Sequence, residues 1–360
     1  MSGIFGALDI NDTDRVYLST LGQSVIYDAI QALLTAYNAE LTQAIAMFVE
    51  ETTEDHTQRY KLPGTGRLQK TGDEAPTGAV RENGQWDVAF PLEGYGAALA
   101  GNRIDMSYMT VQDLDKHLDT VFAMDANTVR FALLQALLNK TNATFADKLW
   151  GNLTVKRLAN ADSDVYPPVL GTETETTSHQ HYNGTNYTEA SISDTNDPYI
   201  TLRDNLEEHF GNPTGGSPIV ALINNSSTLK TLALTKFDPV PDRFVLPQAN
   251  KEYAQLQGIP DVPGRLLGRH SSGVWVVEWR WIPSAYILGV HMAAPKPLKQ
   301  RVDPGFTGLP RGLTMVAKDE DYPISTAYYD HRFGYGVGNR LSACAYQLVA
   351  STTYTTPTGY

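Results

Sequence analysis

The segment at residues 61–85 limits the possible folds of this chain more than any other feature. It is rich in Gly, polar and charged residues, and it is too long for an ordinary connection between two elements. It leads into Trp86, Val88 and Phe90, which alternate with polar or small residues as in a half-buried strand. With residues 56–62 as an antiparallel partner, this pattern predicts a β-hairpin arm. An arm with so little core of its own needs another surface to lie on.

Two long helices are predicted on either side of this arm. Residues 21–51 and residues 110–145 each carry apolar residues at helical spacing along one stripe. Thr110 followed by Asp113 resembles a helix-start signal. A helix of ~35 residues would span about 50 Å at 1.5 Å per residue. That length is unusual in a compact enzyme and suits a spine across a flat plate.

The rest of the chain mixes helices with separate strands. Residues 151–197 are polar and rich in Thr, Asn and Ser, which predicts a surface insertion or a long loop. The elements predicted after it are a helix from Pro198, a buried strand at 219–223, a short helix with Leu229, Leu232 and Leu234, and antiparallel strands at 274–279, 286–290 and 342–349. Because this order lacks a regular βαβ repeat, it predicts an α+β fold.

Composition excludes several classes of protein. The net charge is −12 and Lys and Arg are not clustered, so tight, salt-sensitive binding of nucleic acid is not expected. The chain has no run of 18 or more apolar residues, and its first residues carry acid where a signal peptide carries base. Neither a membrane span nor export through a signal peptide is therefore expected. The one cysteine, Cys344, lies in an apolar stretch and is predicted to be a buried structural thiol.

Candidate chemical sites are few. His179 and His181 could ligate a metal, but no carboxylate or histidine stands at helical spacing behind them, which favours a solvated loop. The glycines of residues 64–66 and 334–338 do not complete a phosphate-binding loop and are interpreted as turns. Residues 319–321 could bind a cation, although a solvated acidic turn is the simpler interpretation. The patterns of nucleophile elbows, zinc proteases and kinases are missing. The sequence thus predicts no catalytic residue, no metal site and no cofactor.

The C-terminal half contains five short motifs in a characteristic order. They are GVWVVE at 273–278, IPSAYILG at 282–289, APKPL at 294–298, RVDP at 301–304 and FGYGVGNR at 333–340. This part of the chain resembles the closing half of tailed-phage major capsid proteins of the Hong Kong 97 fold. The resemblance implies an α+β fold with five segments: an N-terminal arm and helix (1–55), an extended β-hairpin loop (56–105), a peripheral domain with the spine helix and the polar insertion (106–197), an axial domain (198–300) and a return to the peripheral domain (301–360).

The resemblance also implies a function. The chain would be a structural protein, not an enzyme, that self-assembles into pentamers and hexamers of an icosahedral capsid enclosing double-stranded DNA. Its expected partners are further copies of itself, a scaffolding protein, a portal protein and a decoration protein, with no membrane and no tight or sequence-specific DNA binding. It would reside in the virion after assembly in the host cytoplasm. Because the segment before the first helix is short, scaffolding is expected to be a separate protein, unless this is a processed form.

The extended loop supplies the candidate subunit contacts. Its tip carries both signs of charge and is expected to form salt bridges with a neighbouring subunit, while three strand residues are expected to bury apolar area there. These contact residues are Arg67, Lys70, Asp73, Glu74, Arg81, Glu82, Trp86, Val88 and Phe90. The aromatic residues Tyr322, Tyr328, Tyr329, Phe333 and Tyr335 are either interface anchors or ordinary core.

A covalent link between subunits is a minor alternative. The best-known member of the resembled family joins an extended-loop lysine to an asparagine with the help of a glutamate. In this sequence Lys61 and Lys70 lie in the corresponding loop, and Asn339 lies in the C-terminal part. The match of positions is loose and most members of the family form no such link, so assembly is expected to be non-covalent.

Two other functions stay open at this point. A cellular nanocompartment shell of the encapsulin type would share the fold and would need a groove for cargo peptides, which a sequence does not display. A soluble enzyme or a glycan-binding protein would use the polar insertion. Tryptophans on one face of that insertion would support sugar binding, but residues 151–197 contain none.

Overall fold

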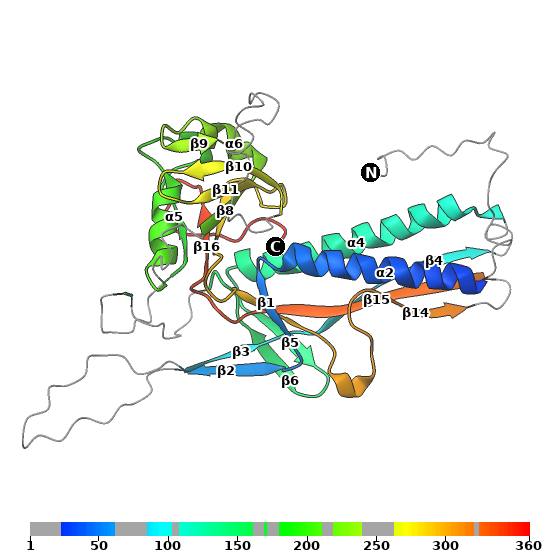
Figure 1. The fold of residues 1–360 in the computed structure, drawn as a ribbon. Helices are drawn as coiled ribbons and strands as arrows, with labels where there is room; N and C mark the ends of the chain where they lie inside the picture. Colours follow the sequence, from blue (N-terminus) through cyan, green and yellow to red (C-terminus); the bar gives the residue numbers. More distant parts are fainter. Residues whose placement is uncertain are drawn as a thin grey trace, which may run out of the picture. The chain divides into compact units, whose positions relative to one another are not determined.

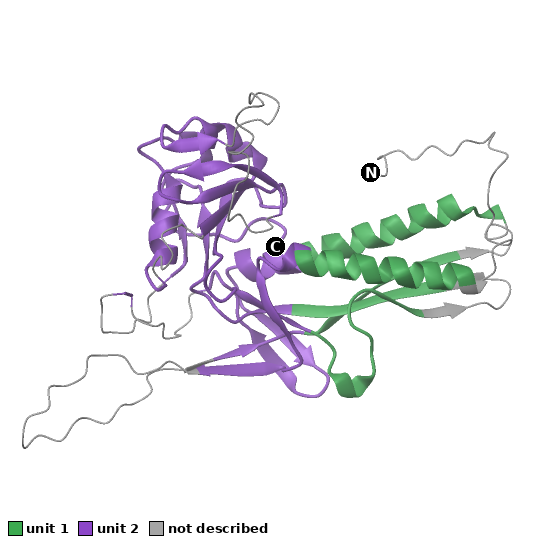
Figure 2. Cartoon of the chain, viewed as in Figure 1, with its two compact units in different colours: residues 1–43, 92–131, 302–334 green, residues 44–91, 132–301, 335–360 purple. Residues whose placement is uncertain are grey.

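The computed structural model describes residues 23–61, 85–102, 108–160, 169–170, 180–210, 219–239, 263–319 and 324–360 (Figure 1). The chain divides into two compact units (Figure 2). Unit 1 consists of Met1–Gln43, Leu92–Phe131 and Val302–Gly334, and unit 2 consists of Ala44–Pro91, Ala132–Arg301 and Tyr335–Tyr360. This is a different division from the five predicted segments, which stay a prediction.

Unit 1 is built from two helices and an antiparallel sheet. Its elements are α2 (Gln23–Ile45), the first part of α4 (Val111–Leu138), β4 (Glu93–Asn102), η3 (Gly305–Thr307), β14 (Thr314–Asp319) and most of β15 (Ile324–Val337). Strand β15 pairs antiparallel with β14 and with β4. The core between helices and sheet is formed by Ile30, Leu34, Leu118, Val121, Leu313 and Tyr329. The predicted apolar stripes of the two long helices therefore do face a common core.

The start of α4 follows the predicted signal. The Thr110 amide donates to the Asp113 carboxylate at 3.1 Å, and the Asp113 amide donates back to the Thr110 hydroxyl at 3.3 Å. This reciprocal pair satisfies amides that the first helical turn leaves without a helical partner. By length and composition α4 could cross a membrane, a property it shares with core helices. Leu118, Val121 and Val129 on it are buried in the fold.

Both long helices end earlier than predicted. Helix α2 ends at Ile45, and the following β1 (Val49–Thr53) pairs in parallel with β13 (Leu298–Arg301). Helix α4 ends at Leu138 and is followed by the hairpin of β5 (Ala143–Asp147) and β6 (Gly151–Val155). At that end the Asn139 side chain accepts from the Thr141 amide at 2.8 Å. Such a local bond competes with helical bonding and favours a turn.

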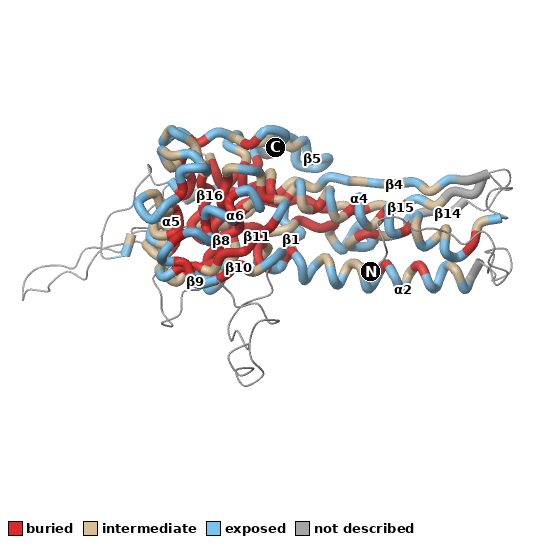
Figure 3. The backbone as a smooth tube through the Cα atoms, turned by 90° about the horizontal axis from the view of Figure 1, so that it is seen from above, coloured by how far each residue is buried: buried red, intermediate tan, exposed pale blue. Residues whose placement is uncertain are grey.

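Unit 2 contains a seven-stranded sheet of order β7-β16-β12-β8-β11-β10-β9. Its strands are β7 (Tyr182–Gly184), β8 (Ile219–Ile223), β9 (Phe237–Pro239), β10 (Arg265–His270), β11 (Trp275–Glu278), β12 (Tyr286–His291) and β16 (Ala343–Gln347). The predicted strands are present, but their predicted antiparallel pairing is only partly right. Two pairs, β7 with β16 and β8 with β11, are parallel. Buried residues concentrate along this sheet (Figure 3).

Two helices accompany this sheet, α5 (Pro198–Glu207) and α6 (Asn225–Leu232). Helix α5 begins as predicted, with Asp197 as its N-cap accepting from the Tyr199 amide at 2.9 Å. It packs so closely on β12 that a Cβ on Gly289 would lie 2.9 Å from Leu202. The leucines predicted as the apolar face of α6 are not all buried, since Leu229 is 79% exposed.

The described residues of the polar insertion at 151–197 do not form only the surface loop that its composition predicts. Its described part contains β6, β7 and the short helix η1 (Glu189–Ser191). Leu158, Ala159 and Tyr182 within it are buried. The error arises because β7 gains its burial from pairing with β16, a strand that is distant in sequence.

Candidate subunit-contact site at the base of the arm

The base of the predicted hairpin arm is present. Strands β2 (Thr57–Lys61) and β3 (Gln85–Ala89) pair antiparallel, with Tyr60 opposite Trp86. Across them Arg59 donates two hydrogen bonds to Asp87, of 2.7 and 2.8 Å, and both side chains are exposed. The hydrogen bond from Arg59 lowers the pKa of Asp87 below its usual value. Six predicted contact residues lie outside the described residues, namely Arg67, Lys70, Asp73, Glu74, Arg81 and Glu82.

Two of the predicted apolar contact residues belong to the chain's own core. Val88 is 1% exposed and Phe90 is 0% exposed. A Cβ on Gly336 would lie 2.5 Å from the Phe90 ring, so that ring fills the space a larger residue would need. Val88 and Phe90 were expected to bury apolar area against a neighbouring subunit. That expectation is wrong for these two residues, because their own chain already buries them. Trp86 lies on β3, and its contact with a neighbour stays a prediction.

A buried ion pair fixes the place where the arm joins unit 2. The Arg301 guanidinium donates to the Asp147 carboxylate at 2.8 Å and to the Phe90 carbonyl at 2.9 Å. The two charged side chains are only 5% and 7% exposed. Burial alone would raise the pKa of Asp147, but hydrogen bonds from the Leu149 amide and from Arg301 outweigh it and hold this pKa below its usual value. Arg301 thus links β13, the end of the arm and the β5–β6 hairpin.

Asp147 also shapes the β5–β6 turn. Its other carboxylate oxygen accepts from the Leu149 amide at 2.8 Å and from the Trp150 amide at 3.2 Å. The turn presents both side chains to solvent, with Leu149 70% exposed and Trp150 58% exposed. One face of the Trp150 ring stacks on His56, with ring centroids 4.2 Å apart and planes 8° apart. The result is a large apolar surface held in one conformation, which we call the turn anchor (Leu149 and Trp150).

A second polar cluster holds the opposite strand of the arm. The Lys299 ammonium donates to Glu51 at 2.6 Å and to Gln58 at 3.1 Å, and it lies 5.8 Å from the centre of the Tyr60 ring. Nearby, a Cβ on Gly338 would lie 2.9 Å from the Tyr60 hydroxyl. Strand β2 is therefore held in place by contacts with β1 and β13.

The residues of the possible cross-link are only partly visible. Lys70 lies outside the described residues, and of Lys61 only the backbone, on β2, is described. The Asn339 side chain donates to the Pro295 carbonyl at 2.9 Å and accepts from the Leu341 amide at 3.0 Å. These bonds give Asn339 a local structural role. A cross-link through it stays untested and is not expected.

The aromatic cluster is mostly core. Tyr329, Phe333 and Tyr335 are each 2% exposed or less, whereas Tyr328 is 47% exposed. Tyr322 lies outside the described residues. Cys344 is buried as predicted, and burial raises the pKa of its thiol far above the usual value. A buried thiol of that kind is a poor nucleophile.

Sequence reasoning missed the turn anchor and the ion pair that supports it. A tryptophan between Lys148 and Gly151, in the short stretch between the predicted helix and the polar insertion, was the available signal. Arg301 and Asp147 are separated by 154 positions. Nothing in the local pattern of either residue indicates the other as its partner.

No protein-family model matches the chain, and no curated protein sequence matches it. Solved structures do match it. A chain from Mycobacterium phage Patience shares 18% identity, with a TM-score of 0.66 over 95% of this chain and 92% of that chain. A chain from the mature capsid of bacteriophage PhiM1 shares 12% identity, with a TM-score of 0.50 over 84% of this chain and 86% of that chain.

This chain therefore has the fold of a phage capsid protein. The α+β class and the capsid fold expected from the C-terminal motifs are thereby confirmed. At these identities the likeness concerns the fold alone. Within this capsid fold, the RVDP motif acquires a physical role, since Arg301 anchors the arm and Asp303 accepts from Arg332 in unit 1.

Proposed function

We propose that this chain is a structural, non-catalytic subunit of an icosahedral virus capsid that encloses double-stranded DNA. The observation that carries the proposal is the likeness to the chain from Mycobacterium phage Patience over 95% of the sequence. The buried pair of Arg301 and Asp147 adds support, because it gives an arm without a core of its own a fixed exit from the subunit.

The proposed mechanism is assembly by shape. Copies of the chain form pentamers and hexamers through heterologous contacts that close into rings. The arm at residues 58–92 lies on a neighbouring subunit, where its tip forms salt bridges that are individually weak and add up over many copies. Assembly takes place in the host cytoplasm with a separate scaffolding protein and a portal protein, and a decoration protein can join the finished shell. The net charge of −12 keeps the shell from binding the enclosed genome tightly.

We include the turn anchor in this proposed contact because its two large apolar side chains are exposed. Large aromatic side chains dominate interface energies, because each buries about 150–250 Å². Covering the exposed part of Trp150 at about 25 cal/mol per Å² would contribute roughly 2–4 kcal/mol to a subunit contact. The Asp147 bonds and the His56 stack hold this ring before assembly, so little conformational entropy is lost when it is covered.

The test is assembly of purified protein with Trp150 replaced by Ser. Sedimentation velocity and negative-stain microscopy should show closed particles for the natural chain. The variant should need at least a tenfold higher concentration to form them, since each 1.4 kcal/mol is a factor of ten. Its unfolding midpoint should stay near that of the natural chain, because Trp150 is 58% exposed.

The matched control is Lys148→Ser, which alters the same turn and leaves the turn anchor in place. It should assemble like the natural chain. Equal assembly of the Trp150 variant and the control would remove the turn anchor from the contact surface. Particles isolated from the natural source distinguish the nanocompartment shell: capsids should contain portal protein and DNA, whereas small empty particles without them would favour the nanocompartment.

A further inference from the structure

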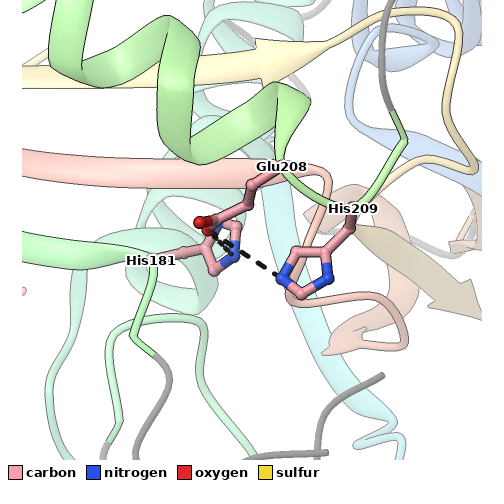
Figure 4. Close-up of side chains that lie close together, drawn as sticks. All are labelled: His181, Glu208 and His209. Carbon is pink, nitrogen blue, oxygen red and sulfur yellow. Dashed lines mark ion pairs between the residues drawn. The ribbon is translucent and has the colours of Figure 1, made fainter. Parts of the chain in front are cut away.

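Three side chains from two distant segments converge in unit 2. His181 comes just before β7, Glu208 follows the last turn of α5, and His209 is the next residue (Figure 4). Their possible ligand atoms all lie within 4.8 Å of one another. The sequence favoured a solvated loop for His181, but its side chain is 2% exposed. That prediction is wrong, since the residue lies inside the fold; its neighbour His179 is outside the described residues.

The cluster is closed to solvent on its histidine side. The His209 side chain is 3% exposed, and the Glu208 side chain, which carries the carboxylate, is 23% exposed. Two imidazoles and one carboxylate are the ligand set of many three-residue zinc sites.

The distances suit ligands around one ion better than direct hydrogen bonds. The Nε2 atom of His181 lies 3.5 Å from the Oε1 atom of Glu208, and the Nε2 atom of His209 lies 3.9 Å from the same oxygen. N–H···O hydrogen bonds are about 2.7–3.2 Å long. In a tetrahedron with metal–ligand bonds of about 2.0–2.2 Å, neighbouring ligand atoms are about 3.4 Å apart. The distance from His181 to Glu208 matches this ligand-to-ligand distance. The distance from His209 to Glu208 is longer, by an amount that a small side-chain movement can accommodate.

The backbone on both sides of the cluster is fixed. The Ala345 amide donates to the His181 carbonyl at 2.9 Å, which attaches this residue to β16. The Leu170 amide donates to the Glu208 carbonyl at 2.8 Å, and the Glu208 amide donates to the Asp204 carbonyl at 3.1 Å. The donors therefore belong to two elements that are held by separate hydrogen bonds, and an ion between them would join the edge strand β7 to the end of α5.

We propose that His181, Glu208 and His209 form a binding site for a divalent transition-metal ion, with Zn²⁺ as the best fit. Imidazole ligands favour Zn²⁺ and its neighbours over Mg²⁺ and Ca²⁺, which take oxygen ligands. Three protein ligands leave a fourth position for water. The ion acts as a structural link within unit 2. The site is independent of the capsid function, because it lies within one subunit.

The probe is Zn²⁺ alone, added to tag-free full-length chain that has been dialysed against a chelator. Isothermal titration calorimetry should show one ion per chain, and Zn²⁺ should raise the thermal unfolding midpoint. Glu208→Gln removes the anionic ligand at almost constant volume, and His209→Asn removes an imidazole. Loss of groups that only orient zinc ligands costs about 10- to 100-fold in affinity, so loss of a ligand should weaken binding at least about 100-fold.

The matched control is His117→Asn, which removes an exposed histidine from α4 in unit 1. It should bind Zn²⁺ like the natural chain and show the same rise in midpoint. The proposal is overturned if the natural chain binds no Zn²⁺, or if Glu208→Gln and His209→Asn bind it as tightly as His117→Asn does. Circular dichroism verifies that each variant is folded. If either variant is unfolded, the absorption spectrum of the natural chain with Co²⁺ replaces the variant test. A spectrum that shows no tetrahedral ligation by nitrogen would also refute the site.

Discussion

Replacing Asp147 by Ala tests the idea that one buried ion pair holds the arm and the turn anchor in place. The substitution removes a charge-assisted bond to Arg301 of 2.8 Å and two bonds to turn amides. It also leaves the Arg301 charge, 5% exposed, without this carboxylate. Breaking a buried pair in this way costs about 3–5 kcal/mol.

The assay is urea unfolding of the unassembled chain, followed by a probe in unit 2 such as tryptophan fluorescence. With an m value of about 3 kcal/mol per M, a loss of about 3–5 kcal/mol lowers the midpoint by roughly 1–1.7 M. The variant should also assemble poorly, because the turn that carries Trp150 loses its internal support.

The matched control is Asp87→Ala. Asp87 accepts two bonds of 2.7 and 2.8 Å from Arg59, so a similar number of contacts is lost. The difference is exposure, since the Asp87 side chain is 49% exposed and the Asp147 side chain is 7% exposed. Exposed pairs contribute little to stability, so the control midpoint should stay close to that of the natural chain. Equal shifts in the two variants would refute the reasoning from burial.

Three further outcomes are expected. The pKa of Asp147 is lower in the folded chain than in the unfolded chain. Its contribution to the free energy of unfolding is therefore complete above the usual carboxyl pKa and is lost as pH falls through the folded pKa. Asp147→Asn should accordingly flatten the loss of stability between about pH 5 and pH 2 in urea titrations. Gly336→Ala should cost about 1–3 kcal/mol of unfolding free energy, because its Cβ would lie 2.5 Å from the Phe90 ring. Gly94→Ala should be tolerated, because the nearest atom to its Cβ would be at an ordinary contact distance of 3.5 Å. Similar thermal midpoints for the two variants would contradict this. Thr110→Ala should cost about 0.5–2 kcal/mol in the unfolding of unit 1, and an unchanged midpoint would show that the capping pair does not stabilise α4.

The elements with strong local patterns could be predicted from the sequence. The two long helices, the strands of the arm and the apolar strand Ile219–Ile223 all follow from periodicity and composition over a few residues. The helix start at Thr110 was predicted for the same reason, since its capping pair lies within four residues. The order of the C-terminal motifs then pointed to the capsid fold.

The parts that failed depend on contacts between distant residues. Residues 49–51 were interpreted as the end of the first helix, but pairing with Leu298–Arg301 makes them a strand. His181 lies in a polar stretch, and it is buried by an edge strand that pairs with β16. The turn anchor depends on Arg301, whose partner Asp147 is 154 positions away. Local patterns carry no information on such pairings.

In the proposed capsid, copies of this chain build a closed shell in which the arm and the turn anchor contact a neighbouring subunit. Cryo-electron microscopy of particles from the expressed chain, with its scaffolding partner if needed, tests this directly. We expect an icosahedral shell of pentamers and hexamers, with residues 62–84 and Trp150 covered by the next subunit. A chain that stays monomeric at high concentration with and without a scaffold, or a shell in which Trp150 faces solvent, would contradict it.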